Sequence, residues 1–160
     1  MKYLKILAFL PAIFMMIVIW GFSDSNAEKS SSLSLEVTKI VVDGIDKISY
    51  DTEYTKEEKE NLIEKLHTPV RKVAHVTEYA ILAVTILLPL YLFELSNKKR
   101  IIITSIVSVV YAISDEIHQI FIPERAGRIS DVLIDSIGIC IGIMSFLGIL
   151  KAIKIISVKK

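Results

Sequence analysis

Ionisable side chains stand within or beside the apolar segments of this sequence, in three groups whose spacing could support chemistry. Arg71, His75 and Glu78 follow one another at i, i+4 and i+7, which places them on one face of a helix. A histidine beside a carboxylate could act as a general acid or base, and an arginine is suited to binding phosphate. The remaining members of the three groups are Lys72, Asp115, Glu116, His118, the uncharged Gln119, Asp131 and Asp135. The i, i+3 spacing predicts that Asp115 lies near His118 and that Glu116 lies near Gln119.

The elements that must position these groups are four apolar runs, at residues 6–22, 73–93, 101–122 and 132–150. Each run is close to the roughly 20 residues that cross the hydrocarbon core of a membrane as a helix. The chain has 160 residues, of which 52% are hydrophobic, and its mean hydropathy of +0.54 is high for a soluble domain. A soluble protein could bury one such run but hardly four, so the sequence predicts an all-α bundle of four transmembrane helices.

Basic residues concentrate in the short segments that would share one side of the membrane. Residues 1–5, 94–100 and 151–160 together hold nine of the 19 basic residues but only one acid, Glu94. Such an excess of Lys and Arg marks the cytoplasmic side. We therefore expect both termini in the cytoplasm and residues 23–68 outside it.

The chain then divides into four parts. They are an N-terminal transmembrane helix (1–22), an extracytoplasmic amphipathic helical loop (23–68), a three-helix membrane core with the polar groups (69–150) and a basic cytoplasmic tail (151–160). The first run followed by Ser25-Asn26-Ala27 also matches a cleavable signal peptide. Its length, and Trp20 at an interfacial position, favour a retained helix.

The segment between the first two runs carries two helical patterns. Apolar residues recur at helical spacing over Leu33–Ser49, which predicts an amphipathic helix. The spacing of Thr55 and Glu58 matches a capping box and predicts a second, short helix. We expect the second transmembrane helix to start separately, with Thr68 as its N-cap and Pro69 in its first turn.

The helical rise predicts that the three polar groups reach similar depths in the membrane. At 1.5 Å per residue, His75, His118 and Asp135 lie roughly 7–9 Å from the outer helix ends, and Glu78 and Asp115 about 12–14 Å. Ionisable groups at such depths should face inward and pair with one another. Small residues at Gly138 and Gly142 would let another helix approach closely beside them.

These motifs resemble those of the VanZ-like family of bacterial membrane proteins. The residues that carry the resemblance are Arg71-Lys72-x-x-His75-x-x-Glu78-Tyr79, Asp115-Glu116-x-His118-Gln119-x-Phe121-x-Pro123-x-Arg125, and Asp131 with Gly138 and Gly142. The resemblance implies an integral membrane protein of the cell envelope, and some members are associated with resistance to the glycopeptide teicoplanin. It implies no settled reaction. The sequence departs from the family pattern at Glu124, commonly glycine, and at Asp135, commonly asparagine.

Three hypotheses account for the polar groups. In the first, they form a structural network that holds the helices in register. In the second, which we favour, they bind an anionic lipid or a lipid-linked cell-wall intermediate. The ligand-binding residues would be Arg71, Lys72, Gln119, Arg125, Arg128, Asp131 and Asp135.

The third hypothesis is a membrane-embedded hydrolase of a lipid phosphate or pyrophosphate. Its catalytic candidates are His75, Glu78, Asp115, Glu116 and His118, with the two histidines as acid and base. A divalent metal held by some of these residues is a variant. The spacing Asp115-Glu116-x-His118 is not a familiar metal-binding motif, so no metal is assigned and no cofactor is identified. The basic residues are too thinly spread for a nucleic-acid partner. The expected partner is the lipid bilayer.

Overall fold

The computed structural model describes residues 2–24, 27–48, 54–123 and 127–158. These residues form helices joined by turns, without any strand in the described ranges. The helices are α1 (Lys2–Leu7), α2 (Leu10–Ser23), α3 (Ala27–Ile48), α4 (Lys56–Leu90), α5 (Asn97–Ile120) and α6 (Ile129–Val158).

Four helical stretches are long and apolar enough to cross a membrane, as predicted. They are Lys5–Ser23, Lys56–Leu90, Asn97–Ile120 and Ile129–Ile153. Large apolar side chains such as Phe14, Ile106 and Met144 point out of the bundle, which suits a lipid environment and not water. The all-α, four-span architecture predicted from the sequence is therefore confirmed.

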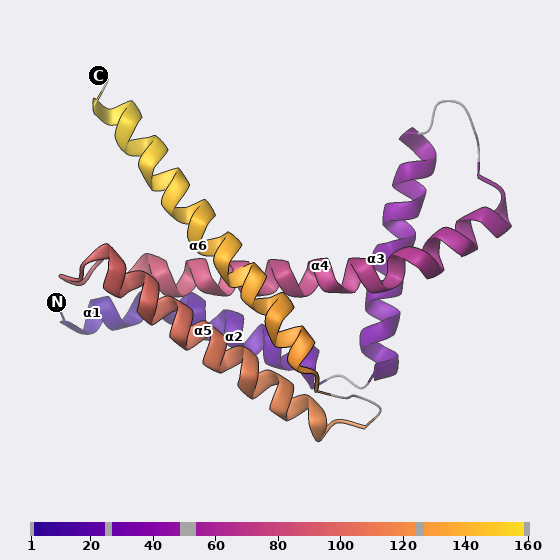
Figure 1. Cartoon of the computed structure of the whole chain (residues 1–160), viewed down its shortest axis with the longest axis horizontal. Coiled ribbons are helices and arrows are strands. Elements are labelled where there is room, and N and C mark those ends of the chain that lie inside the picture. The colour runs from indigo at the N-terminus through magenta and orange to yellow at the C-terminus, as the bar shows by residue number, and fades with distance from the viewer. Residues whose placement is uncertain (1, 25–26, 49–53, 124–126, 159–160) are drawn as a thin grey trace.

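In the bundle, α2, α4 and α5 run side by side and α6 crosses α4 at a steep angle (Figure 1). The free ends of α1 and α6 lie toward the same end of the bundle (Figure 1). Buried side chains of α4, among them Tyr79, Leu82 and Leu87, pack with Ala112 of α5 and Ile139 of α6. The core of the bundle is thus centred on α4.

The contact between α4 and α6 is made by backbone at two glycines. A Cβ atom added to Gly138 would lie 2.3 Å from the carbonyl oxygen of Val76, and one added to Gly142 would lie 2.3 Å from that of Ala80. The close helix approach predicted from the Gly138-x-x-x-Gly142 spacing is confirmed, because no larger residue fits either position without moving the helices apart.

Helix α4 begins earlier than the sequence suggested. The capping box at Thr55 and Glu58 is confirmed, since the Thr55 side chain accepts from the Glu58 amide and the Glu58 carboxylate accepts from the Thr55 amide. The helix that starts there continues through Thr68 and Pro69 to Leu90, so the separate N-cap predicted at Thr68 is wrong. Proline removes one helical hydrogen bond and often bends a helix without ending it.

Helix α3 lies across α4 near the end of the bundle remote from the chain ends (Figure 1). The amphipathic helix predicted over Leu33–Ser49 is confirmed, with bounds that begin earlier, at Ala27. It rests on α4 through the buried side chains of Thr38 and Val42. Two polar contacts flank this crossing: Ser34 Oγ lies 2.7 Å from His67 Nε2, and Lys59 pairs with Asp46.

Candidate functional site

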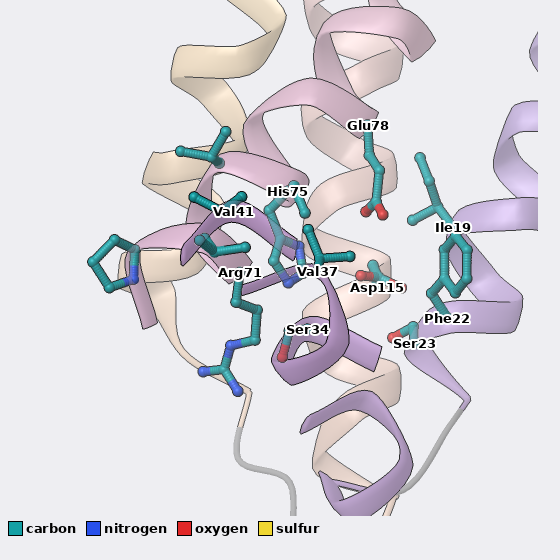
Figure 2. Close-up of a pocket in the computed structure, with 14 residues that line it drawn as sticks. Ile19, Phe22, Ser23, Ser34, Val37, Val41, Arg71, His75, Glu78 and Asp115 are labelled. Atoms are coloured by element: carbon teal, nitrogen blue, oxygen red, sulfur yellow. The ribbon is translucent and has the colours of Figure 1, made fainter. Parts of the chain in front are cut away.

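A cavity of about 500 Å³ lies where α2, α3, α4 and α5 meet. Figure 2 shows the residues that line it, which come from these four helices. The apolar part of the lining is Ile19, Phe22, Val37, Val41, Pro69, Val70, Val73 and Ala74. The polar part is Ser23, Ser34, Arg71, His75, Glu78 and Asp115. The cavity therefore combines hydrocarbon walls with a small number of ionisable groups, as ligand sites commonly do.

Acidic groups gather at one end of the cavity. Glu78 of α4 and Asp115 of α5 lie there beside Ser23 of α2 (Figure 2). Asp115 is only 1% exposed, and its Oδ2 accepts a hydrogen bond of 3.1 Å from Gln119 Nε2. The buried Ser23 hydroxyl makes no hydrogen bond within the described ranges. This end offers chiefly acceptor oxygens, so it would repel an anionic group and favour a hydrogen-bond donor.

His75 connects the cavity to a buried carboxyl on α6. Its Nδ1 lies 3.8 Å from Oδ1 of Asp135, a distance within ion-pair range but too long for a hydrogen bond. Asp135 is 1% exposed and does not line the cavity, so it stands behind the histidine. The pair lies beside the glycine contact, and its position follows from the close approach of α4 and α6.

Arg71 lies at the other end of the cavity, next to Ser34 and away from Glu78 (Figure 2). Its side chain is exposed although it contributes to the lining. The neighbouring Lys72 is also exposed but takes no part in the lining. The spacing of Arg71, His75 and Glu78 on one helix face thus places one cation, one histidine and one acid along the cavity, as the sequence predicted.

His118 contacts α2 and does not line the cavity, unlike Asp115. Its ring stacks on Trp20 at 4.0 Å between centroids, and its Nε2 lies 3.3 Å from Asp24 Oδ1. We expected His118 to lie near Asp115, but three residues advance a helix by about 300°, leaving His118 about 60° to one side. That rotation carries its ring to α2, while Asp115 pairs with Gln119 one position further on.

Glu116 also differs from its expected pairing with Gln119. It is buried, and its Oε2 accepts a hydrogen bond of 2.7 Å from the backbone amide of Arg128. This contact holds the connection to α6 against the end of α5. A Cβ atom on Gly127 would lie 2.2 Å from the Glu116 carbonyl oxygen, so the backbone comes very close there.

The residues predicted to bind a ligand beside α6 do not line the cavity. Arg128 is exposed, and Asp131 accepts a hydrogen bond from Ser130 Oγ at 3.3 Å. Arg125 and Glu124 lie outside the described residues. Of the predicted residues, the cavity brings together Arg71, His75, Glu78 and Asp115, with Gln119 and Asp135 directly behind them.

Two polar contributors to this region were not predicted, Ser23 and the Ser34–His67 pair. His67 precedes Arg71 by four residues and therefore continues the same helix face toward the N-terminus of α4. The i, i+4 spacing of His67 and Arg71 is present in the sequence, but a helix that starts at Pro69 would not include His67. Among the described residues, no three His, Cys, Asp or Glu side chains lie close enough to hold a metal ion together.

Comparison with known proteins identifies one relationship. No curated protein and no solved structure matches this chain. A family model, VanZ/LLP1, matches residues 8–151, which include all of α2 to α5 and most of α6. The match covers nearly the whole chain and contains every ionisable group of the cavity. This chain therefore belongs to the VanZ/LLP1 family of membrane proteins.

Proposed function

We propose that this protein binds an amphiphilic lipid with an anionic head group, such as a lipid-linked cell-wall intermediate, at the outer face of the membrane. The cavity at the end of the bundle is the observation that carries the proposal. Its volume of about 500 Å³ lies within the usual range for small-molecule sites, and eight of its 14 lining residues are apolar. The apolar lining residues would contact the hydrocarbon chain of a lipid, which a water-soluble ligand lacks.

The charges along the cavity favour one orientation of the head group. Glu78 and Asp115 at the acidic end would repel a phosphate, whereas Arg71 at the opposite end could hold it with two parallel hydrogen bonds. We therefore place the phosphate at Arg71 and the hydrocarbon against the valines and Phe22. A cell-wall intermediate held in this way would be less accessible to a glycopeptide acting at the surface, which is how this protein would contribute to teicoplanin resistance.

Lipid retention by the purified protein tests this proposal. Native mass spectrometry would compare phosphatidylglycerol with phosphatidylcholine of the same acyl chains, in the wild type and in Arg71→Gln. Loss of a charge-assisted hydrogen bond costs about 1.5–3 kcal/mol, so Arg71→Gln should weaken phosphatidylglycerol binding roughly 10- to 100-fold. Lys72→Gln is the matched control, because Lys72 is an adjacent exposed cation outside the lining. Equal retention by Arg71→Gln and Lys72→Gln would contradict the proposal.

A second candidate function, hydrolysis of a lipid phosphate or pyrophosphate, rests on the pairing of His75 with Asp135. A buried carboxylate behind a histidine can orient the ring and support its role as a general base. His118 stacks on Trp20 away from the cavity, so it is not the partner acid in this arrangement. Purified protein should release phosphate from a polyprenyl pyrophosphate and lose this activity in His75→Gln. Absence of turnover in the wild type with Mg²⁺, Mn²⁺ or Zn²⁺ would eliminate this candidate.

A further inference from the structure

We propose that α3 lies in the plane of the membrane, with its apolar face inserted in the lipid layer at the outer ends of the spanning helices. The proposed occupant of this face is the lipid surface itself. This placement of α3 does not depend on the bound ligand. Sideways entry of the ligand beneath α3, in contrast, rests on the proposed function.

The orientation of α3 relative to the bundle is the first argument. The spanning helices α2, α4 and α5 run along the bundle axis, whereas α3 crosses that axis (Figure 1). If the spans cross the bilayer, then α3 runs along its surface. Its 22 residues extend for about 33 Å in that plane.

The distribution of side chains around α3 is the second argument. One face carries Val37, Ile40, Val41, Ile45 and Ile48, all of them exposed. Ile40 is 71% exposed and Ile48 is 75% exposed, far more than residues used in protein packing. An adjoining face carries the exposed charged side chains of Glu36, Lys39 and Asp43, with Lys47 at the border between the two faces. Helices with these two faces typically lie at the membrane interface.

The contact with α4 leaves this apolar face available. Thr38 and Val42, which pack on α4, project from the side of α3 between its apolar and charged faces. A helix that used its apolar face for packing would show the reverse pattern, with the isoleucines buried.

The cavity decides which way the apolar face points. Val37 and Val41 line it together with Ile19 of α2 and Val73 of α4, both of which belong to spanning segments. The apolar face of α3 is therefore turned toward the level of the spans, and the charged face is turned away from them. A lipid layer must be present at that level, which favours lipid over a protein partner or a second copy of this chain.

The same geometry makes α3 the roof of the cavity. A lipid moving in the adjacent layer could pass beneath Val37 and Val41 and reach Arg71 without leaving the membrane. We therefore infer that the ligand of the proposed site comes from the bilayer.

Site-directed spin labelling in lipid vesicles tests the placement of α3. The full chain carries one cysteine, Cys140, so Cys140→Ser provides the background for single labels. Ile40→Cys and Ile48→Cys report on the apolar face, and Lys39→Cys and Asp43→Cys are controls on the charged face. Vesicles of phosphatidylcholine and phosphatidylglycerol would be probed with oxygen, which concentrates in lipid, and with a water-soluble nickel chelate.

We expect labels at 40 and 48 to collide more with oxygen and less with nickel than labels at 39 and 43. Equal nickel accessibility at all four positions would overturn the placement. An independent readout is quenching of Ile40→Trp by brominated lipids in a Trp20→Phe background, where lack of quenching would also overturn it. Neither measurement needs a bound ligand. If the labels show the expected accessibilities but Arg71→Gln retains phosphatidylglycerol as the wild type does, the proposed function alone is refuted. If Arg71→Gln loses phosphatidylglycerol but the labels do not show the expected accessibilities, the placement of α3 alone is refuted.

Discussion

The two helix crossings on α4 are built on different principles. At the α4–α6 crossing, Gly138 and Gly142 bring two backbones together with no space for a methyl group. At the α3–α4 crossing, two small buried side chains are flanked by polar contacts, Ser34 with His67 and Asp46 with Lys59. The first crossing is fixed by steric fit within the membrane. The second depends on polar side-chain contacts, for which hydrogen bonds to water can partly substitute. The bundle should therefore keep its geometry when α3 moves.

The largest expected effect comes from filling the glycine contact. Gly138→Ala or Gly142→Ala places a methyl group against a carbonyl oxygen of α4 and should cost about 1–3 kcal/mol or more, because the helices must separate. Thermal unfolding of the detergent-solubilised protein measures this loss. Gly148→Ala is the control on the same helix, since an added Cβ there meets nothing within 4 Å. Equal melting temperatures for all three variants would mean that the close contact does not contribute to stability.

A smaller effect of opposite sign is expected on α3. Gly44 lies within the helix, and an added Cβ there meets nothing within 4 Å. Gly44→Ala should stabilise α3 by about 0.5–1 kcal/mol, since alanine loses less backbone entropy in a helix. Hydrogen exchange of α3 amides should slow roughly two- to fivefold, with no change in α6. Gly21→Ala, equally open but on α2, should leave α3 exchange unchanged, and faster exchange in Gly44→Ala would contradict the prediction.

The smallest effect is expected at the partly exposed ion pair between Lys59 and Asp46, which flanks α3. The Lys59 ammonium and the Tyr54 amide hold the pKa of Asp46 below its ordinary value of 3.8. The contribution of this contact is therefore complete above about pH 4 and is lost as the pH falls through the lowered pKa. A spin label at position 40 should become more mobile over that acidic range. Asp46→Asn should abolish this pH step, and Asp43→Asn, an exposed acid on the same helix, should preserve it.

The spanning helices, the capping box at Thr55 and the glycine contact were predictable because each depends on a short-range sequence pattern. Apolar runs, the capping box at Thr55 and the glycine spacing each specify local geometry, and all three are found. The continuity of α4 was not predictable in the same way. Proline at position 69 follows a good N-cap residue, and nothing local shows that packing against α3 and the capping box upstream would carry the helix through it.

The cavity was only half predictable for a related reason. Helical spacing predicted that Arg71, His75 and Glu78 share one face of one helix, and all three line the cavity. The separation of His118 from Asp115 depends on where α2 lies relative to α5, and α2 supplies Trp20 as the stacking partner. The roles of Ser23 and Ser34 likewise depend on the positions of whole helices, which residue spacing within one helix does not contain.

The His75–Asp135 pairing has a consequence for the biogenesis of this protein. The two partners lie on the second and the last of the four spans, so the ribosome completes Asp135 on the order of ten seconds or less after His75. During that interval His75 lacks its contact with Asp135 and Glu116 lacks its contact with the Arg128 amide, and a charge near the membrane centre without such a contact costs about 3 kcal/mol. Truncation before α6 should therefore yield spans that are poorly retained in the membrane and readily degraded. Stable retention of the earlier spans in the bilayer should therefore require the synthesis of α6.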